Sequence, residues 1–162
     1  MPYITISPAS VWFTKQYPAD KWTSFVNRLT TTHHIYLLGG PGDVALAEAI
    51  KAGAPQLPLT NLCGKLNFLQ STALMKRAVM NYVNDSAPMH FASAVNAPVT
   101  AVYCSTLPSF GFGPLSDKRF IVEVQEPLPC RPCGLHGRKT CPLGHFKCAC
   151  NIMDEQLLAA LE

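Results

Sequence analysis

The sequence predicts an α/β fold with a doubly wound, mainly parallel, Rossmann-like sheet. Short apolar runs of strand character alternate with helix-period segments about five times along the chain. The connections are long enough for crossover helices, and right-handed crossovers place helices on both faces of a sheet. Hydrophobic residues make up 48% of the 162 residues and charged residues only 14%. This balance is typical of a large buried sheet or of a surface that faces a partner.

The first half of the chain supplies the first three strands. Pro18 opens a helix whose apolar residues recur at helical spacing as far as Leu29. The glycine-rich turn 39–42 directly follows a continuous apolar run, a pattern typical of a buried strand that ends in a turn. Strands are therefore expected over residues 3–6, 34–38 and 59–62, and helices over residues 18–29 and 43–52.

The second half continues the alternation and then changes character. Helices are expected over residues 69–78, 86–96 and 154–161, and strands over residues 79–84, 98–103 and 120–124. A Gly/Pro-rich loop over residues 107–118 precedes the last strand. Residues 130–150, here called the cysteine-rich segment, carry five of the seven cysteines and no helical or strand periodicity. We therefore expect a main domain at residues 1–126, with residues 127–162 packed on it.

Composition excludes several classes of function. The net charge of +3 comes from scattered basic residues, too weak a pattern for a nucleic-acid-binding protein. No apolar run approaches the ~20 residues of a membrane span. Strand-like residues begin at Tyr3, so we expect no signal peptide and a cytoplasmic protein. In that compartment free or metal-bound thiols are favoured over disulfides.

Polar residues follow three of the predicted strands. Ligands of an open parallel sheet bind at the carboxyl ends of its strands, so these residues should share one edge. After the first strand come Ser7, Ser10 and Lys15; after the second, the turn 39–42 and Asp43; after the fourth, Asp85 and Ser86.

Each of these residues has an ordinary structural interpretation beside the functional one. Asp85 or Ser86 could cap a helix, or the helix start could hold a phosphate while Asp85 accepts hydrogen bonds from sugar hydroxyls. Lys15 could be a solvated surface lysine or could neutralise a diphosphate. Asp43 could simply begin a helix or could hold ribose hydroxyls. His90 could face a ligand or be a plain helix histidine. The turn 39–42 fits neither a Walker loop nor the dinucleotide fingerprint.

The cysteine-rich segment offers candidate metal ligands. Its cysteines are Cys130, Cys133, Cys141, Cys148 and Cys150, with His136 and His145 between them. The first pair has the Cys-x-x-Cys spacing of a zinc knuckle, whereas the last pair has a single intervening residue. A segment without a core of its own would gain from a structural zinc. The alternative is a set of free thiols that covers the edge of the domain.

Several motifs, in order along nearly the whole chain, resemble glycosyltransferase family nine, the bacterial lipopolysaccharide heptosyltransferases. The run 84–90 with residues 92–94 and Pro98 resembles the family signature. Residues 7–10 with 15–18 and Trp22, residues 38–43 and residues 61–65 resemble earlier motifs of the family's second half. Residues 130–133 and 140–145 resemble the tail of heptosyltransferase II-like members.

The resemblance implies the C-terminal half of a GT-B fold, the half that binds an ADP-heptose donor. Ser10, Lys15, Ser86 and Ala87 would then hold the diphosphate, Asp43 the ribose, Lys65 and Leu66 the base, Asp85 the sugar, and His90 would face the donor. Two departures stand out. Ala87 replaces a usual glycine, which makes close backbone approach harder, and Asp43 replaces a common glutamate.

The resemblance also implies an inverting glycosyltransferase that needs no cofactor for catalysis. The acceptor, a lipid A–core lipopolysaccharide, and the catalytic base would belong to an N-terminal domain that this chain does not contain. We therefore expect donor binding with little or no transfer by the chain alone, in the cytoplasm or at the inner face of the inner membrane. A non-catalytic nucleotide-sugar-binding module, a zinc-stapled interaction module and a different donor such as a UDP-sugar remain alternatives.

Overall fold

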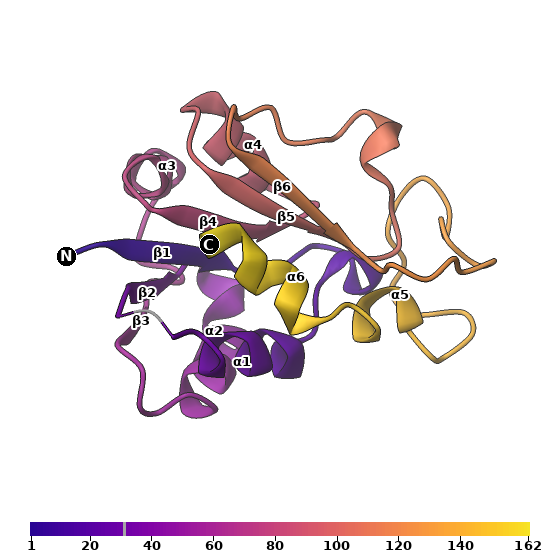
Figure 1. Ribbon diagram of the computed structural model, residues 1–162, viewed down its shortest axis with the longest axis horizontal. Coiled ribbons are helices and arrows are strands. Elements are labelled where there is room, and N and C mark those ends of the chain that lie inside the picture. The colour runs from indigo at the N-terminus through magenta and orange to yellow at the C-terminus, as the bar shows by residue number, and fades with distance from the viewer. Residues whose placement is uncertain (31) are drawn as a thin grey trace.

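The computed structural model, which describes residues 1–30 and 32–162, contains one parallel sheet in the order β3-β2-β1-β4-β5-β6 (Figure 1). The strands are β1 (Tyr3–Ser7), β2 (His34–Leu37), β3 (Leu59–Asn61), β4 (Met80–Asn84), β5 (Val99–Tyr103) and β6 (Arg119–Glu123). Every pairing within this sheet is parallel. The predicted doubly wound α/β fold is confirmed.

Helices cover both faces of the sheet (Figure 1). They are α1 (Ala19–Asn27), α2 (Val44–Ala52), α3 (Phe68–Lys76), α4 (Ala87–Ala94), α5 (Lys147–Cys150) and α6 (Asp154–Leu158). The helices α1, α2 and α6 lie on one face, and α3 and α4 lie on the other. Neighbouring side chains of a strand point to opposite faces of the sheet. Tyr82 therefore packs on the face of α1, α2 and α6, and Val83 on the face of α3 and α4. No helix in the described part of the chain is long and apolar enough to cross a membrane.

The helices form where apolar spacing and capping residues agree. In α1, Trp22, Phe25 and Val26 recur at helical spacing and are all fully buried. Asn67 begins α3 with a capping box, in which its side chain accepts from the Gln70 amide at 2.8 Å and its own amide donates to the Gln70 side chain at 3.0 Å. These local signals determine the residue at which each crossover helix begins and hence the length of the loop after the preceding strand.

Element boundaries differ from the sequence expectation at a few places. The segment predicted as a helix from residue 43 begins with a 3₁₀ turn at Pro41–Asp43, because Pro41 fixes the first turn before α2 starts. The helix α4 ends at Ala94, since Asn96 adopts the left-handed conformation with φ 53°. The short α5 and the 3₁₀ turn Phe13–Lys15 were not predicted, because neither is long enough to show a period.

The cysteine-rich segment is mostly irregular, yet it leads into the main core. Phe146, Ala149, Ile152 and Leu157 belong to the same buried cluster as the α1 and β1 side chains. Figure 1 shows the segment looping beyond the ends of β5 and β6 before α6 returns beneath the sheet. Residues 127–162 therefore share the core of the sheet domain.

The strand order has its switch point between β1 and β4. The strand β1 pairs with β2 on one side and with β4 on the other, so the chain leaves these two strands toward opposite halves of the sheet. In open α/β sheets, ligands bind in the crevice that this reversal creates. The predicted polar residues after β1 and β4 flank this point.

Candidate functional site

A cavity of about 540 Å³ opens at the carboxyl ends of β1, β2 and β4. Five of the nine predicted donor-binding residues line it, namely Ser10, Asp43, Leu66, Ser86 and Ala87. The volume lies within the range of small-molecule sites. The expectation that three strand ends share one edge is met, and the edge is hollow at that point.

The start of α4 is directed at this cavity. Ser86 occupies the N-cap position with extended backbone, but its side chain makes no capping hydrogen bond; its hydroxyl donates instead to the Asn84 carbonyl at 3.4 Å. Ala87 and Pro88, the first two residues of the helix, line the cavity. The positive end of the α4 dipole therefore faces the open space without a side-chain cap, an arrangement that favours an anionic group.

Asp85 lies beside that helix start in a polar cluster. Its carboxylate is nearly buried and forms an ion pair with Lys15, with 3.3 Å between Nζ and Oδ2. The Thr106 hydroxyl donates to the same oxygen at 2.7 Å. Neither Lys15 nor Asp85 lines the cavity itself, but Asp85 immediately precedes Ser86. The structure thus brings Lys15 and Asp85 together at the cavity rim, and it adds Thr106, which sequence reasoning missed.

Asp43 is held by its own turn and also lines the cavity. The Gly40 amide donates to its Oδ2 at 2.8 Å. A Cβ at Gly39 would lie 2.7 Å from the same oxygen, so this position has no room for a side chain. Asp43 can therefore both begin the helix and face a ligand, because one carboxylate oxygen orders the turn while the residue lines the cavity.

Two aromatic residues that sequence reasoning missed give the cavity an apolar part. The rings of Phe68 and Phe91 lie 5.3 Å apart between centroids, and both residues line the cavity with Leu66 and Met75. Phe68 is 76% exposed at the start of α3. The sequence signal that could have indicated it is a phenylalanine placed directly after the helix-capping residue Asn67. Such rings suit a planar, partly apolar group such as a nucleobase.

Two buried polar residues shape the wall between β1 and β4. The Asn84 side chain is fully buried and connects three backbone groups: it accepts from the Tyr17 amide at 3.0 Å and donates to the carbonyls of Pro8 (2.9 Å) and Ala9 (3.3 Å). Ser7 lines the cavity with its hydroxyl buried and without a protein partner among the described residues. Asn84 thereby fixes the loop after β1, next to the buried Ser7 hydroxyl.

Two predicted donor-binding residues stand apart from the cavity. Lys65 and His90 are both exposed, and neither is among the residues that line it. On α4 the buried positions are Met89 and Ala92, so His90 falls on another side of the helix. The geometry therefore gives no support to the expectation that His90 faces a ligand in this cavity.

The cysteine-rich segment surrounds a second cavity of about 190 Å³. Cys130, Cys133, Cys141, Cys148 and His145 line it, whereas Cys150 is exposed and lies outside it. All seven cysteines are free. Over residues 1–30 and 32–162, no three Cys, His, Asp or Glu side chains are grouped so that they could hold a metal ion. Four of the five predicted metal ligands thus share a cavity without forming a ligand set, and the zinc site stays a prediction.

Two thiols around this second cavity differ in acidity. Burial tends to raise the pKa of Cys141, but hydrogen bonds from backbone amides outweigh it and lower the pKa; the amides are those of Phe146, Leu143, Gly144 and His145. Burial raises the pKa of Cys148 to about 11, with a further contribution from Cys141. Cys141 is therefore the thiol that ionises more readily and would be the better nucleophile or metal ligand near neutral pH.

Known proteins share both the fold and the sequence pattern. Residues 1–145 match the family model described as glycosyltransferase family 9 (heptosyltransferase). The lipopolysaccharide heptosyltransferase 3 of Escherichia coli (strain K12) is 33% identical over 107 residues, which cover 64% of this chain and 31% of that protein. The lipooligosaccharide heptosyltransferase 2 of Haemophilus influenzae is 32% identical over 118 residues, covering 67% and 34%.

A solved structure extends the likeness in fold. The structure of the E. coli ADP-heptose lps heptosyltransferase II superposes on 99% of this chain with a TM-score of 0.80 and 23% sequence identity, and this region is 45% of that chain. The present chain therefore spans less than half the length of each of these proteins.

Proposed function

Because this chain belongs to glycosyltransferase family 9, the heptosyltransferases, we propose that its main cavity binds the nucleotide-sugar donor, with ADP-heptose as the donor. The observation that carries the proposal is the start of α4, which faces the cavity without a side-chain cap and lies next to Lys15. A diphosphate is the part of such a donor that this arrangement would recognise. The likeness to a heptosyltransferase whose name specifies ADP-heptose supports the choice of donor.

The remaining parts of the donor have matching surroundings. In this proposal Ser10, Ser86 and Ala87 surround the diphosphate, and Asp43 accepts hydrogen bonds from the ribose with the carboxylate oxygen that its turn leaves free. The base lies at the apolar end of the cavity, between Leu66 and the two phenylalanines described above. Asp85, which the ion pair and Thr106 hold beside the start of α4, would accept hydrogen bonds from the sugar.

The chemistry that this half supplies is stabilisation of a leaving group. When an acceptor hydroxyl attacks the anomeric carbon with inversion, negative charge develops on the departing diphosphate. In this proposal the α4 dipole and the Lys15 ammonium, which the ion pair with Asp85 holds beside the start of α4, stabilise that charge without a metal cofactor. We propose that the acceptor is the inner core of a lipopolysaccharide, and that an N-terminal domain supplies the base that deprotonates it. The transfer would then take place in the cytoplasm, at the inner face of the membrane.

Donor binding is tested by a matched pair of substitutions at the two ends of α4. Ala87 is exposed and lines the cavity, so Ala87→Glu would place a carboxylate where the diphosphate binds; Ala94→Glu adds the same charge at the exposed far end of the helix. We expect calorimetry to show ADP binding by the wild-type chain and by Ala94→Glu, and a loss of at least about tenfold in affinity for Ala87→Glu. Absence of ADP binding by the wild type would contradict the proposal.

The identity of the donor is tested by comparing nucleotides. A thermal-shift series with ADP-heptose, ADP, UDP and GDP should show the largest stabilisation with the adenine compounds. Stronger stabilisation by UDP would favour a UDP-sugar donor instead.

The absence of turnover is tested separately. We expect no transfer to a lipid A–core acceptor when the 162-residue chain is supplied with ADP-heptose, and robust turnover would contradict the assignment of the base to another domain. A non-catalytic nucleotide-sugar-binding module would also bind donor without turnover. The two are separated by adding an N-terminal domain from a matched relative, which should restore transfer only if this half is catalytic.

A further inference from the structure

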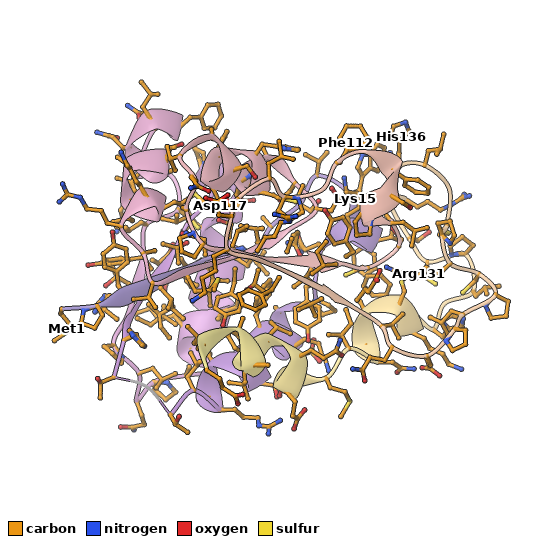
Figure 2. The ribbon with its side chains drawn as sticks, turned by 45° about the horizontal axis from the view of Figure 1, so that its top comes forward. Met1, Lys15, Phe112, Asp117, Arg131 and His136 are labelled. Carbon is orange, nitrogen blue, oxygen red and sulfur yellow. The ribbon has the colours of Figure 1, made fainter. Side chains whose placement is uncertain are left out.

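The cysteine-rich segment makes direct contacts with the two loops that carry the polar rim of the donor cavity. One loop holds Lys15 and the other holds Thr106, and both side chains contact the Asp85 carboxylate. Figure 2 shows Lys15 and Arg131 at the same end of the molecule, opposite Met1 at the start of β1. The segment is therefore next to the cavity rim, although it follows in sequence only after the last strand.

Thr14 is the point where the three pieces of chain meet. Its hydroxyl accepts from the Arg138 amide at 2.7 Å and from the Ser105 hydroxyl at 3.1 Å. Its amide donates to the Arg138 carbonyl at 3.1 Å, and its carbonyl accepts from the Ser105 amide at 3.1 Å. Thr14 and Ser105 are both buried. These four hydrogen bonds connect residues adjacent to Lys15 and to Thr106 with the segment.

Arg131 holds the second loop from the other side. Its guanidinium donates to the carbonyls of Cys104 (2.8 Å) and Thr106 (3.0 Å) and pairs with Glu123 at 2.7 Å. Its side chain is only 11% exposed. The Cys133 amide adds a bond to the Ser105 carbonyl at 2.9 Å. A planar fork that bonds two carbonyls of one loop fixes that loop in position and orientation, which a lysine would not do.

Gly137 contacts the Lys15 side chain itself. A Cβ at this glycine would lie 2.9 Å from Cγ of Lys15 and 2.2 Å from Cβ of Trp12. These distances are too short for any side chain, so even alanine would displace one of the two neighbours. The stem of Lys15 is thus confined between the segment and its own loop, with its ammonium directed at Asp85.

We propose that the cysteine-rich segment is a positioning element of the donor site, in which Arg131 and Gly137 fix Thr106 and Lys15 and thereby set the affinity for the diphosphate. This inference rests on the proposed function. A lysine has a long flexible stem, and ordering it on binding costs affinity. A segment that confines the lysine stem beforehand removes this entropic cost of binding. The gain applies to the diphosphate alone, because the base and ribose are held elsewhere in the cavity.

The test separates the diphosphate from the rest of the nucleotide. Calorimetry would compare ADP and adenosine on the full chain with Arg131→Gln and Gly137→Ala. We expect ADP affinity to fall about tenfold in each variant, with adenosine affinity changed less than about twofold. Two control variants are matched to these: Lys139→Gln removes one positive charge at an exposed position of the segment, and Gly113→Ala adds a methyl group where only one atom lies near, at 3.9 Å. Both controls should keep the wild-type affinities.

Each result bears on a different claim. Folded Arg131→Gln and Gly137→Ala proteins that bind ADP as the wild type does would overturn the inference while leaving the proposed function intact. Equal losses of ADP and adenosine would overturn it as well, since they would indicate a general loosening of the cavity. If Arg131→Gln does not fold, Arg131→Lys keeps the charge without the fork and serves the same comparison. Failure of the wild type to bind ADP would contradict the proposed function itself.

Discussion

The donor cavity and the cysteine-rich segment lie next to each other but are held in place by different interactions. The cavity walls extend from β1 and β4, whose backbones pair in register from Ile4 with Met80 to Ser7 with Val83. The segment has only the short α5, whose surroundings pack into the core through Phe146 and Ala149. Its irregular part is fixed by individual hydrogen bonds to Thr14, Ser105 and Cys104. A change at the strand ends should therefore lower stability, whereas a change in the segment should alter geometry in a chain that remains folded.

The largest effect is expected from Asn84, which connects the two strand ends. Asn84→Ala leaves the Tyr17 amide and the carbonyls of Pro8 and Ala9 without their buried partner. We expect the free energy of unfolding to fall by about 2–4 kcal/mol in urea denaturation. Asn151→Ala, at an exposed position, should change it by less than about 0.5 kcal/mol. A loss below about 1 kcal/mol for Asn84→Ala would contradict the role given to this side chain.

A smaller effect, on binding instead of folding, is expected at the rim. Lys15→Met removes the cation beside α4, and we expect ADP affinity to fall by about 2 kcal/mol, or roughly thirtyfold, in calorimetry. Lys51→Met, at an exposed position of α2, makes the same chemical change away from the cavity and should have no effect. Equal affinities for the two variants would show that Lys15 is only the ion-pair partner of Asp85.

A third prediction concerns the cysteine-rich segment and asks whether its cavity binds zinc. If the second cavity closes on zinc, metal analysis of the purified chain should find about one equivalent, and less than about half would count against the site. Cys130→Ser should lose the metal, while Cys150→Ser should keep it, because Cys150 is exposed and lies outside the cavity. Loss in both variants would mean that the segment rearranges around the metal.

The smallest expected effect is a difference in reactivity between two thiols. Because the pKa of Cys141 is lowered and that of Cys148 is raised to about 11, the thiolate of Cys141 should be present at lower pH. The thiols would be labelled with iodoacetamide at a series of pH values and analysed by mass spectrometry. The rate of alkylation at Cys141 should rise at a lower pH than the rate at Cys148. In denaturant the two pH profiles should coincide. Profiles that already coincide in the folded chain would contradict the amide cluster around Cys141.

The features that the sequence predicted are those that follow from period and topology. Alternating apolar runs determined the sheet, and the rule that ligands bind at carboxyl ends placed Ser10, Asp43 and Ser86 at one edge before their contacts were known. The resemblance to a family added Leu66 and Ala87, which also line the cavity. Such positions depend on backbone direction, which local patterns encode well.

The features that could not be predicted depend on contacts between distant residues. Thr106 reaches Asp85 across 21 residues, and the Arg138 amide reaches Thr14 across 124. No local pattern encodes such pairs. His90 shows the same limit, because the start of α4 was foreseen but the side of the helix that packs inward was set by Met89 and Ala92. The cysteines share a cavity, but their spacing alone did not reveal that Cys150 would lie outside it.

The central place of β1 has a consequence for how the chain is made. Thr5 pairs with Asn81, which the ribosome adds 76 residues later, and the Tyr82 hydroxyl donates to the Leu157 carbonyl a further 75 residues along. The strand β1 thus gains its second neighbour only after β4 has been synthesised, and this part of the core closes with α6. Until then β1 exposes an unpaired edge, which other nascent chains can join. Slow, late folding with a need for chaperone protection is the expected cost of placing the first strand in the middle of the sheet.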